Sequence, residues 1–198
     1  MIFLIKMEDT IVFIDAGFLS KLSKHFGKGK YLKNNLVNLS KIFTKKENLN
    51  CKHIFYYTAP PFQSSKPTKD ENKRKENYDN FIRIFSKNKI VTVREGRCQR
   101  IINNHKIEYH QKGVDTFLTM DLMTVPIKYK KVKKIILIAC DSDFVPVIKN
   151  LNTLKVKTIL FTYFDKKRGS NFSTSNELIQ VVSKYVAMTK SDFKESIK

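Results

Sequence analysis

Acidic residues directly follow two of the predicted buried strands. Residues 10–14 are a short apolar, β-branched run that ends at Asp15, and residues 135–140 are a second such run that ends at Asp141. Asp143 lies two residues further on. Ligands of open parallel α/β sheets bind beyond the carboxyl ends of the strands. We therefore expect these three carboxylates to share one edge of a sheet.

Carboxylates gathered in this way repel one another unless a cation or a proton compensates. Mg²⁺ and Mn²⁺ prefer oxygen ligands, so the three aspartates together predict a divalent-metal site. The alternative is helix capping, because an aspartate before a helix commonly accepts backbone N–H bonds. Capping explains Asp143 alone equally well, whereas metal binding explains Asp15, Asp141 and Asp143 together better.

Two further aspartates lie on the helix predicted over residues 114–125. Asp115, near its start, is either a cap or a fourth ligand. Asp121 lies six residues later, about 120° further round a regular helix, so the two cannot point the same way. One is expected to face the metal while the other supports it or binds water.

Strand and helix patterns alternate along the chain. Strands are predicted over residues 10–14, 51–58, 90–93, 135–140 and 156–161, and helices over residues 17–26, 31–43, up to about 87, 114–125, 144–153 and 176–186. Residues 99–102 and 106–109 predict a β-hairpin. The alternation predicts a three-layer α/β/α domain with a mainly parallel central sheet. We expect one domain over residues 1–188 and a charged, frayed tail over residues 189–198.

A net charge of +20, from 38 Lys and Arg against 18 Asp and Glu, is the strongest compositional signal. Such a field attracts polyanions, and nucleic acid is favoured over an anionic membrane. Solvated lysines of a lysine-rich chain are the alternative. The candidate phosphate contacts are Arg94, Arg97, Arg100 and Lys112 around the hairpin, Ser142, and Lys166, Lys167 and Arg168 after another strand.

Several classes of site are absent from the sequence. The three cysteines form no CxxC pair, which excludes a zinc knuckle or disulfide framework and favours a cytoplasmic location. No GxSxG, P-loop or GxGxxG motif occurs. The apolar start is too short to span a bilayer. Tyr57, Phe62 and Tyr109 are candidates to stack on bases, although core packing or plain exposure is favoured for each. A homodimer is left open.

Four segments, residues 12–19, 112–121, 137–146 and 175–178, together resemble the NYN domain family, in its LabA-like branch of the PIN-like nuclease superfamily. The resemblance implies a PIN-like, Rossmann-like fold and an acidic site that binds Mg²⁺ or Mn²⁺ for RNA cleavage. It implies Asp15, Asp115, Asp141 and Asp143 as the site carboxylates, with Asp121 as a helper. Two positions depart from the family pattern. Phe18 stands where many relatives have Asn, and Ser183 where many have an acid.

We therefore expect a metal-dependent ribonuclease that contacts the RNA backbone more than its bases. The main rival is a non-catalytic RNA-binding module with the same fold. A third class, the aspartate-based α/β phosphatases, needs a second acid two residues after the first-strand aspartate. Gly17 occupies that position, so this class ranks low.

Overall fold

The computed structural model describes residues 7–103, 106–165, 172 and 176–197. Six strands form one sheet in the order β3-β2-β1-β6-β7-β8, and every neighbouring pair is parallel. A separate antiparallel hairpin is formed by β4 and β5. The strands are β1 (Glu8–Asp15), β2 (Leu49–Thr58), β3 (Val91–Glu95), β4 (Arg97–Asn103), β5 (Lys106–Lys112), β6 (Lys134–Ile138), β7 (Lys157–Thr162) and β8 (Lys184–Ala187).

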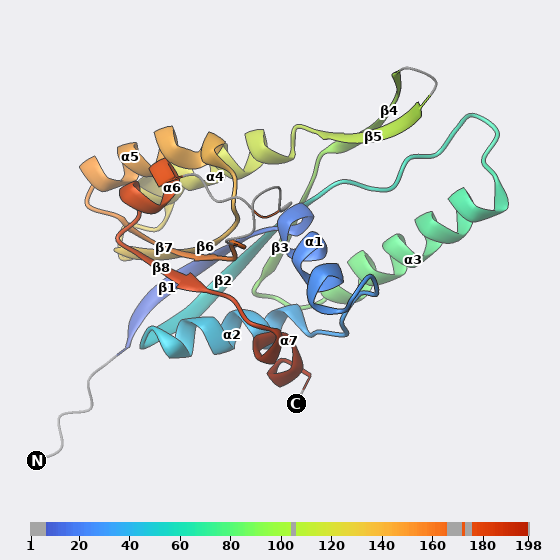
Figure 1. Cartoon of the computed structure of the whole chain (residues 1–198). Coiled ribbons are helices and arrows are strands. Elements are labelled where there is room, and N and C mark those ends of the chain that lie inside the picture. Colours follow the sequence, from blue (N-terminus) through green and yellow to red (C-terminus); the bar gives the residue numbers. More distant parts are fainter. Residues whose placement is uncertain (1–6, 104–105, 166–171, 173–175, 198) are drawn as a thin grey trace, which may run out of the picture.

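Helices cover both faces of the sheet, which confirms the predicted three-layer α/β/α fold (Figure 1). α4, α5 and α6 lie on one face, and α1, α2 and α7 on the other. No helix within the described ranges is long and apolar enough to cross a membrane. The helices are α1 (Ala16–Phe26), α2 (Leu36–Lys46), α3 (Lys69–Phe85), α4 (Val114–Lys128), the 3₁₀ turn η1 (Ser142–Phe144), α5 (Val145–Thr153), α6 (Asn176–Val181) and α7 (Lys190–Glu195).

The side chains of the central strand β1 are apolar on both faces of the sheet, so helices must bury both faces. Its side chains alternate, so that Ile11 and Phe13 pack under α4 and α5, whereas Val12 and Ile14 pack against α1 and α2. All four are fully buried. A continuous apolar run is the pattern of a strand buried on both faces, as residues 10–14 predicted.

The strand order places a crevice at the carboxyl ends of β1 and β6. From β1 the chain adds β2 and β3 on one side, then crosses over and adds β6, β7 and β8 on the other. In doubly wound sheets the ligand site lies where the strand order reverses in this way. Asp15 ends β1, and Asp141 follows β6 by three residues.

The chain beyond residue 181 differs from the prediction. A helix was expected over 176–186, but α6 ends at Val181 and β8 follows, parallel to β7. The open edge of β7 thereby gains hydrogen-bond partners, which a longer helix would have left unmade. The expected frayed tail instead forms α7, because Phe193 is fully buried against α1.

Three other helices differ in detail. α2 begins at Leu36 rather than 31, since the side chain of Asn35 caps it by accepting from the N–H groups of Val37 and Asn38. The helix predicted over residues 114–125 continues to Lys128 as α4, with Pro126 inside it, and loses one backbone hydrogen bond near its last turn. Phe81 of α3 and Phe117 of α4 are each 38% exposed.

The role of α7 can be tested by truncating its buried ring. We expect Phe193→Ala to lower the free energy of unfolding by about 3 kcal/mol, because it opens a cavity between α7, α1 and the sheet. Lys194→Ala, on the exposed side of the same helix, is the matched control and should change it by less than about 0.5 kcal/mol. Urea denaturation measures both, and equal stabilities would mean that α7 does not pack as described.

Candidate active site

Asp15 is held at the junction between β1 and α1. Its Oδ1 accepts hydrogen bonds from the backbone N–H groups of Gly17 (2.8 Å) and Phe18 (3.2 Å), so the carboxylate caps α1. The side chain is half-buried. Burial raises its pKa to about 6, the negative charge of Asp115 adds to this rise, and the two backbone bonds act against it.

Asp141 is fixed in a similar way beyond β6. Its Oδ1 accepts from the N–H of Asp143 (3.0 Å) and caps η1. Asp143 lies within η1, and both side chains are exposed. Capping, which the sequence suggested for Asp143, therefore occurs at Asp15 and Asp141 instead. Backbone N–H groups orient these two carboxylates without neutralising them.

Asp115 joins this group from a third element, as a residue of the first turn of α4. Gly113 precedes the helix with a φ of 81°, in the left-handed region that favours glycine. Partial desolvation and the negative charges of Asp141 and Asp143 raise the pKa of Asp115. The four carboxylates therefore act on one another as a single electrostatic cluster, which we call the acidic cluster: Asp15, Asp115, Asp141 and Asp143.

The chemistry of the acidic cluster fits a hard divalent cation. All four side chains offer carboxylate oxygens, and within the described residues none of them has an ion-pair partner. No three acidic, His or Cys side chains of the described residues converge closely enough to enclose a metal ion. The exposed side chains of Asp115, Asp141 and Asp143 would have to turn inward around Asp15 to do so.

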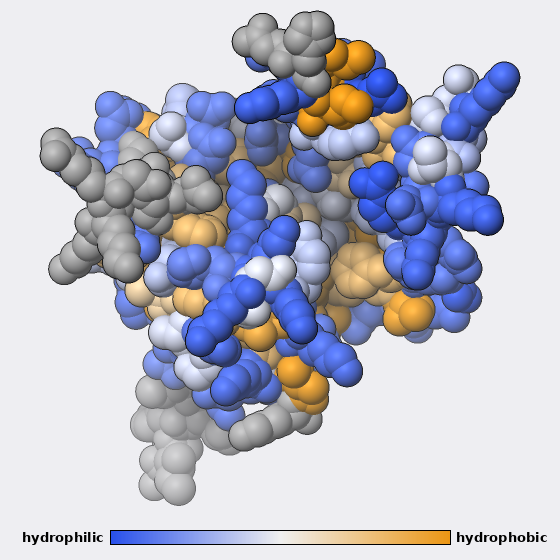
Figure 2. Space-filling view, turned by 45° about the vertical axis from the view of Figure 1, so that its right-hand side comes forward, coloured by the Kyte–Doolittle hydropathy of each residue, from blue (hydrophilic) through white to orange (hydrophobic). Residues whose placement is uncertain are grey.

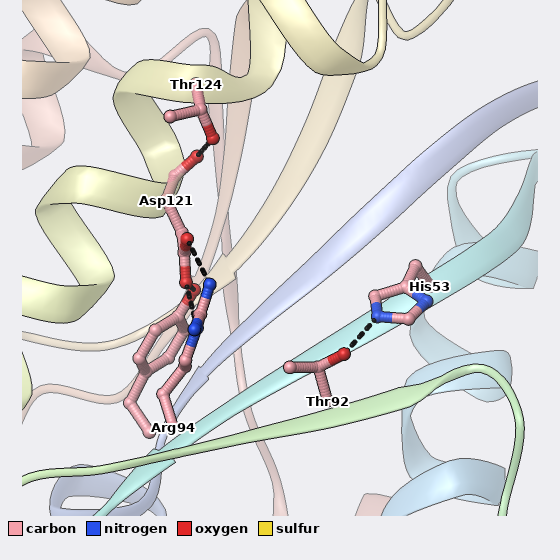
Figure 3. Close-up of polar contacts among 6 residues, drawn as sticks. His53, Thr92, Arg94, Asp121 and Thr124 are labelled. Carbon is pink, nitrogen blue, oxygen red and sulfur yellow. Dashed lines mark hydrogen bonds and ion pairs between the residues drawn. The ribbon is translucent and has the colours of Figure 1, made fainter.

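Asp121, on the same helix as Asp115, has other partners (Figure 3). Its Oδ2 accepts from Arg94 Nε and from the Tyr57 hydroxyl, both at 3.0 Å, and its Oδ1 accepts from Arg94 Nη2 at 3.1 Å. Tyr57 is fully buried on β2, and Arg94 is its neighbour in register on β3. The forked ion pair raises the pKa of the Arg94 guanidinium further above its usual range.

These contacts bear on three residues that the sequence singled out. Both carboxylate oxygens of Asp121 are occupied on the sheet side of α4, so we do not carry Asp121 into the metal site. Arg94 neutralises Asp121 and is not a free phosphate contact. Tyr57 is a core residue, which was the interpretation favoured over base stacking. Together the three side chains fasten α4 to the sheet and so set the position of Asp115.

The remaining phosphate contacts predicted from the sequence lie on the surface. Arg97, Arg100 and Lys112 are exposed on the hairpin, and Ser142 is exposed in η1. Arg97 and Lys112 are partners in register at the base of the hairpin, next to α4. Lys166, Lys167 and Arg168 lie outside the described residues.

A cleft beside Asp15 was not predicted from the sequence. It has a volume of about 800 Å³ and lies between the start of α1, the end of β2, α3 and β5. Aromatic side chains line it, namely Tyr31, Tyr56, Tyr78, Phe81 and Tyr109. No local sequence pattern predicts it, because these rings come from four separate segments that only the tertiary fold brings together.

The profile of the NYN domain matches residues 9–189 of the chain. The chain belongs to the NYN domain family. NYN domains are a family of PIN-like nucleases, so a nuclease-type, RNA-related function is supported at this coarse level.

The NYN fold is also seen in a solved structure of low sequence identity. The chain is similar to a protein of unknown function from Vibrio parahaemolyticus RIMD 2210633, with 15% identity and a TM-score of 0.57. The match covers 94% of this chain and 96% of that chain. At this identity the likeness shows the fold alone. No curated protein matches the chain.

The structure shows the surroundings of Phe18 and Ser183, the two positions that depart from the NYN pattern. Phe18 is buried against the sheet, and its N–H still donates to Asp15. Ser183 lies between α6 and β8 rather than in a helix, and its N–H donates to the carbonyl of Thr158. Neither position changes a carboxylate of the acidic cluster.

The raised pKa of Asp15 predicts a stabilising substitution. In Asp15→Asn the amide oxygen keeps the cap while the charge is lost. The folded state disfavours the Asp15 carboxylate, so wild-type stability falls as pH rises from about 4 to about 6. At pH 7 without metal the variant should be more stable by on the order of 1 kcal/mol, with the gain disappearing below pH 4.

Chemical denaturation of both proteins at pH 4 and pH 7 measures this difference. Asp9→Asn is the matched control, because it removes a charge from the amino end of the same strand. A variant no more stable than wild type at pH 7 would contradict the electrostatic account of Asp15.

Truncating the two aspartates of α4 should have different effects on the free energy of unfolding. Asp121→Ala leaves the buried Tyr57 hydroxyl and Arg94 unpaired and should cost about 2 kcal/mol of unfolding free energy. Asp115→Ala removes an exposed, repelled charge and should cost nothing measurable. Urea denaturation without metal compares them, and equal costs would show that Asp121 does not fasten α4.

Proposed function

We propose that this NYN domain is a metal-dependent ribonuclease that hydrolyses RNA phosphodiester bonds at the acidic cluster. One observation carries the proposal: four carboxylates lie at the switch point of the sheet, and within the described residues no ion pair compensates them. Such a group is costly to the folded protein unless a cation is part of its working state. Family membership supports a nuclease at the coarse level.

Asp15, Asp115, Asp141 and Asp143 would hold one or two ions of Mg²⁺ or Mn²⁺. A cation bound there lowers the pKa of a bound water and offsets negative charge that develops on the phosphate. Asp15 and Asp141 are oriented by backbone N–H groups, so their free oxygens are aimed before any ligand arrives. Asp115 comes to the cluster from the first turn of α4, and Asp143 from η1.

Other residues of the chain position the RNA backbone. Ser142 lies between two of the carboxylates and offers a hydroxyl to a phosphate oxygen. Lys112 and Arg97 stand at the base of the hairpin, where their charges attract the strand toward the cluster. Contacts of this kind position RNA but read no sequence.

A cleavage assay tests the proposal directly. Labelled RNA is incubated with Mn²⁺ and either wild type, Asp141→Asn or the control Asp9→Asn. We expect Asp141→Asn to lower the cleavage rate by about 100-fold or more, since even groups that only support metal ligands cost 10- to 100-fold when lost. Asn preserves the cap of η1, so folding should be unaffected.

Equal cleavage by wild type and Asp141→Asn would refute the assignment. The rival function, RNA binding without turnover, predicts instead that wild type binds RNA in a salt-dependent way but cleaves none at any Mn²⁺ concentration. That the acidic side chains do not converge in the described structure is the observation that keeps this rival under test.

A further inference from the structure

The cleft beside Asp15 has a composition that the acidic cluster does not explain. Five of the described side chains that line it are aromatic, and Lys21, Arg74 and His110 add basic groups. No Asp or Glu occurs among the described residues that line it. Flat rings with basic groups complement a ligand that is aromatic and anionic at once, which describes a nucleotide.

The cleft is continuous with the acidic cluster. Ala16 and Gly17, which directly follow Asp15, form one end of it. A Cβ atom on Gly17 would lie 3.1 Å from Asp15 Oδ1 and 3.6 Å from Gln111 Oε1. Asp15 and the β5 wall of the cleft thus lie on either side of the same glycine. When an RNA phosphate lies at the acidic cluster, the base of the adjacent nucleotide can therefore reach the cleft.

The walls of the cleft are held in place by their own contacts. On α3, Phe81 packs edge-on against Tyr56 of β2, and the Tyr78 hydroxyl donates to Glu95 at the end of β3 (2.6 Å). On β5, Tyr109 packs against Phe62, with ring centroids 5.7 Å apart. These contacts leave the rings at the mouth accessible: Tyr31 is 69% exposed, Tyr109 48% and Phe81 38%.

The surface itself shows the opening. Figure 2, which brings this side of the molecule forward, shows a hollow below the hairpin with hydrophilic side chains around it. Figure 1 shows α3 and the hairpin extending on the same side of the sheet, with the connection from β2 to α3 running between them. The rings at the mouth can stack on a base only if the faces of that base are free. A base within a duplex is covered by its neighbours, so the cleft can take only an unpaired, unstacked base.

We propose that this cleft is a binding site for one unpaired, unstacked RNA base adjacent to the scissile phosphate, with Tyr31 and Tyr109 as the stacking residues. The inference rests on the proposed function, since it takes RNA as the substrate of the acidic cluster. It makes the protein selective for single strands and adds a contact that depends on the base, beyond the phosphate contacts of the hairpin.

Binding without metal tests the site separately from cleavage. Fluorescence anisotropy in EDTA compares a labelled single-stranded oligoribonucleotide of about ten nucleotides, an abasic strand of the same length and charge, and a duplex. We expect wild type to bind the base-containing strand about tenfold more tightly than the abasic strand. Tyr31→Ala and Tyr109→Ala should each bring that ratio down toward one while leaving duplex affinity unchanged.

Two variants serve as controls. Tyr109→Phe keeps the ring and should keep the ratio. Tyr185→Ala removes a tyrosine of matched exposure, 46%, from the far edge strand β8 and should also keep it. Equal affinity of wild type for the abasic and base-containing strands would overturn the proposal. So would tyrosine variants that lose affinity for all three nucleic acids alike, which would indicate a structural role.

The two proposals fail in different ways. Asp141→Asn should retain the ratio between base-containing and abasic strands, whether or not wild type cleaves RNA. A ratio of one in a protein that cleaves RNA refutes the cleft alone. A ratio near ten in a protein that never cleaves supports the cleft and refutes the ribonuclease.

Discussion

Mutual repulsion among four carboxylates is the constraint on which the rest of this structure depends. Left to themselves, Asp15, Asp115, Asp141 and Asp143 would separate, so the fold has to hold their backbones close together. β1 and β6 are neighbouring parallel strands, so Asp15 and Asp141, which follow them, lie at the same edge of the sheet. The core beneath buries Ile11 to Ile14 completely and makes that placement rigid. The stability of the core is therefore what allows charges of one sign to remain near one another.

The position of Asp115, the fourth carboxylate, depends on the contacts that Asp121 makes from the same helix, α4. α4 carries Asp115 toward the cluster and Asp121 toward the sheet, where Arg94 and Tyr57 donate hydrogen bonds to the Asp121 carboxylate. Asp121 is thus fully paired, whereas Asp115 has no ion-pair partner among the described residues. The division follows from the angle of about 120° between positions six residues apart. It explains how two acids on one helix serve folding and chemistry separately.

The sequence predicted those features that depend on local pattern. Strand runs such as residues 135–140, with an aspartate directly after them, gave the sheet and the acidic cluster, because the period of a buried strand and the topology of parallel sheets leave few alternatives. Features that depend on distant partners were missed. Residues 184–187 became a strand because β7 offered an open edge, and Arg94 became a structural residue because Asp121 lies opposite. The rings of the cleft could not be grouped at all, since Tyr31, Phe81 and Tyr109 share no segment.

The hairpin leaves the rest of the chain and rejoins it at a single place. Its two ends, Arg97 and Lys112, face each other in register, and the backbone enters through Gly96 and leaves through Gly113. A Cβ atom on Gly96 would lie 2.4 Å from the carbonyl oxygen of Lys112, so the chain enters and leaves the hairpin in close contact. A segment that departs and returns at one point can change in length or composition without moving either β3 or α4. The hairpin is thus a natural graft position, at which the reach and charge of the protein toward its ligand can be exchanged while the carboxylates stay fixed.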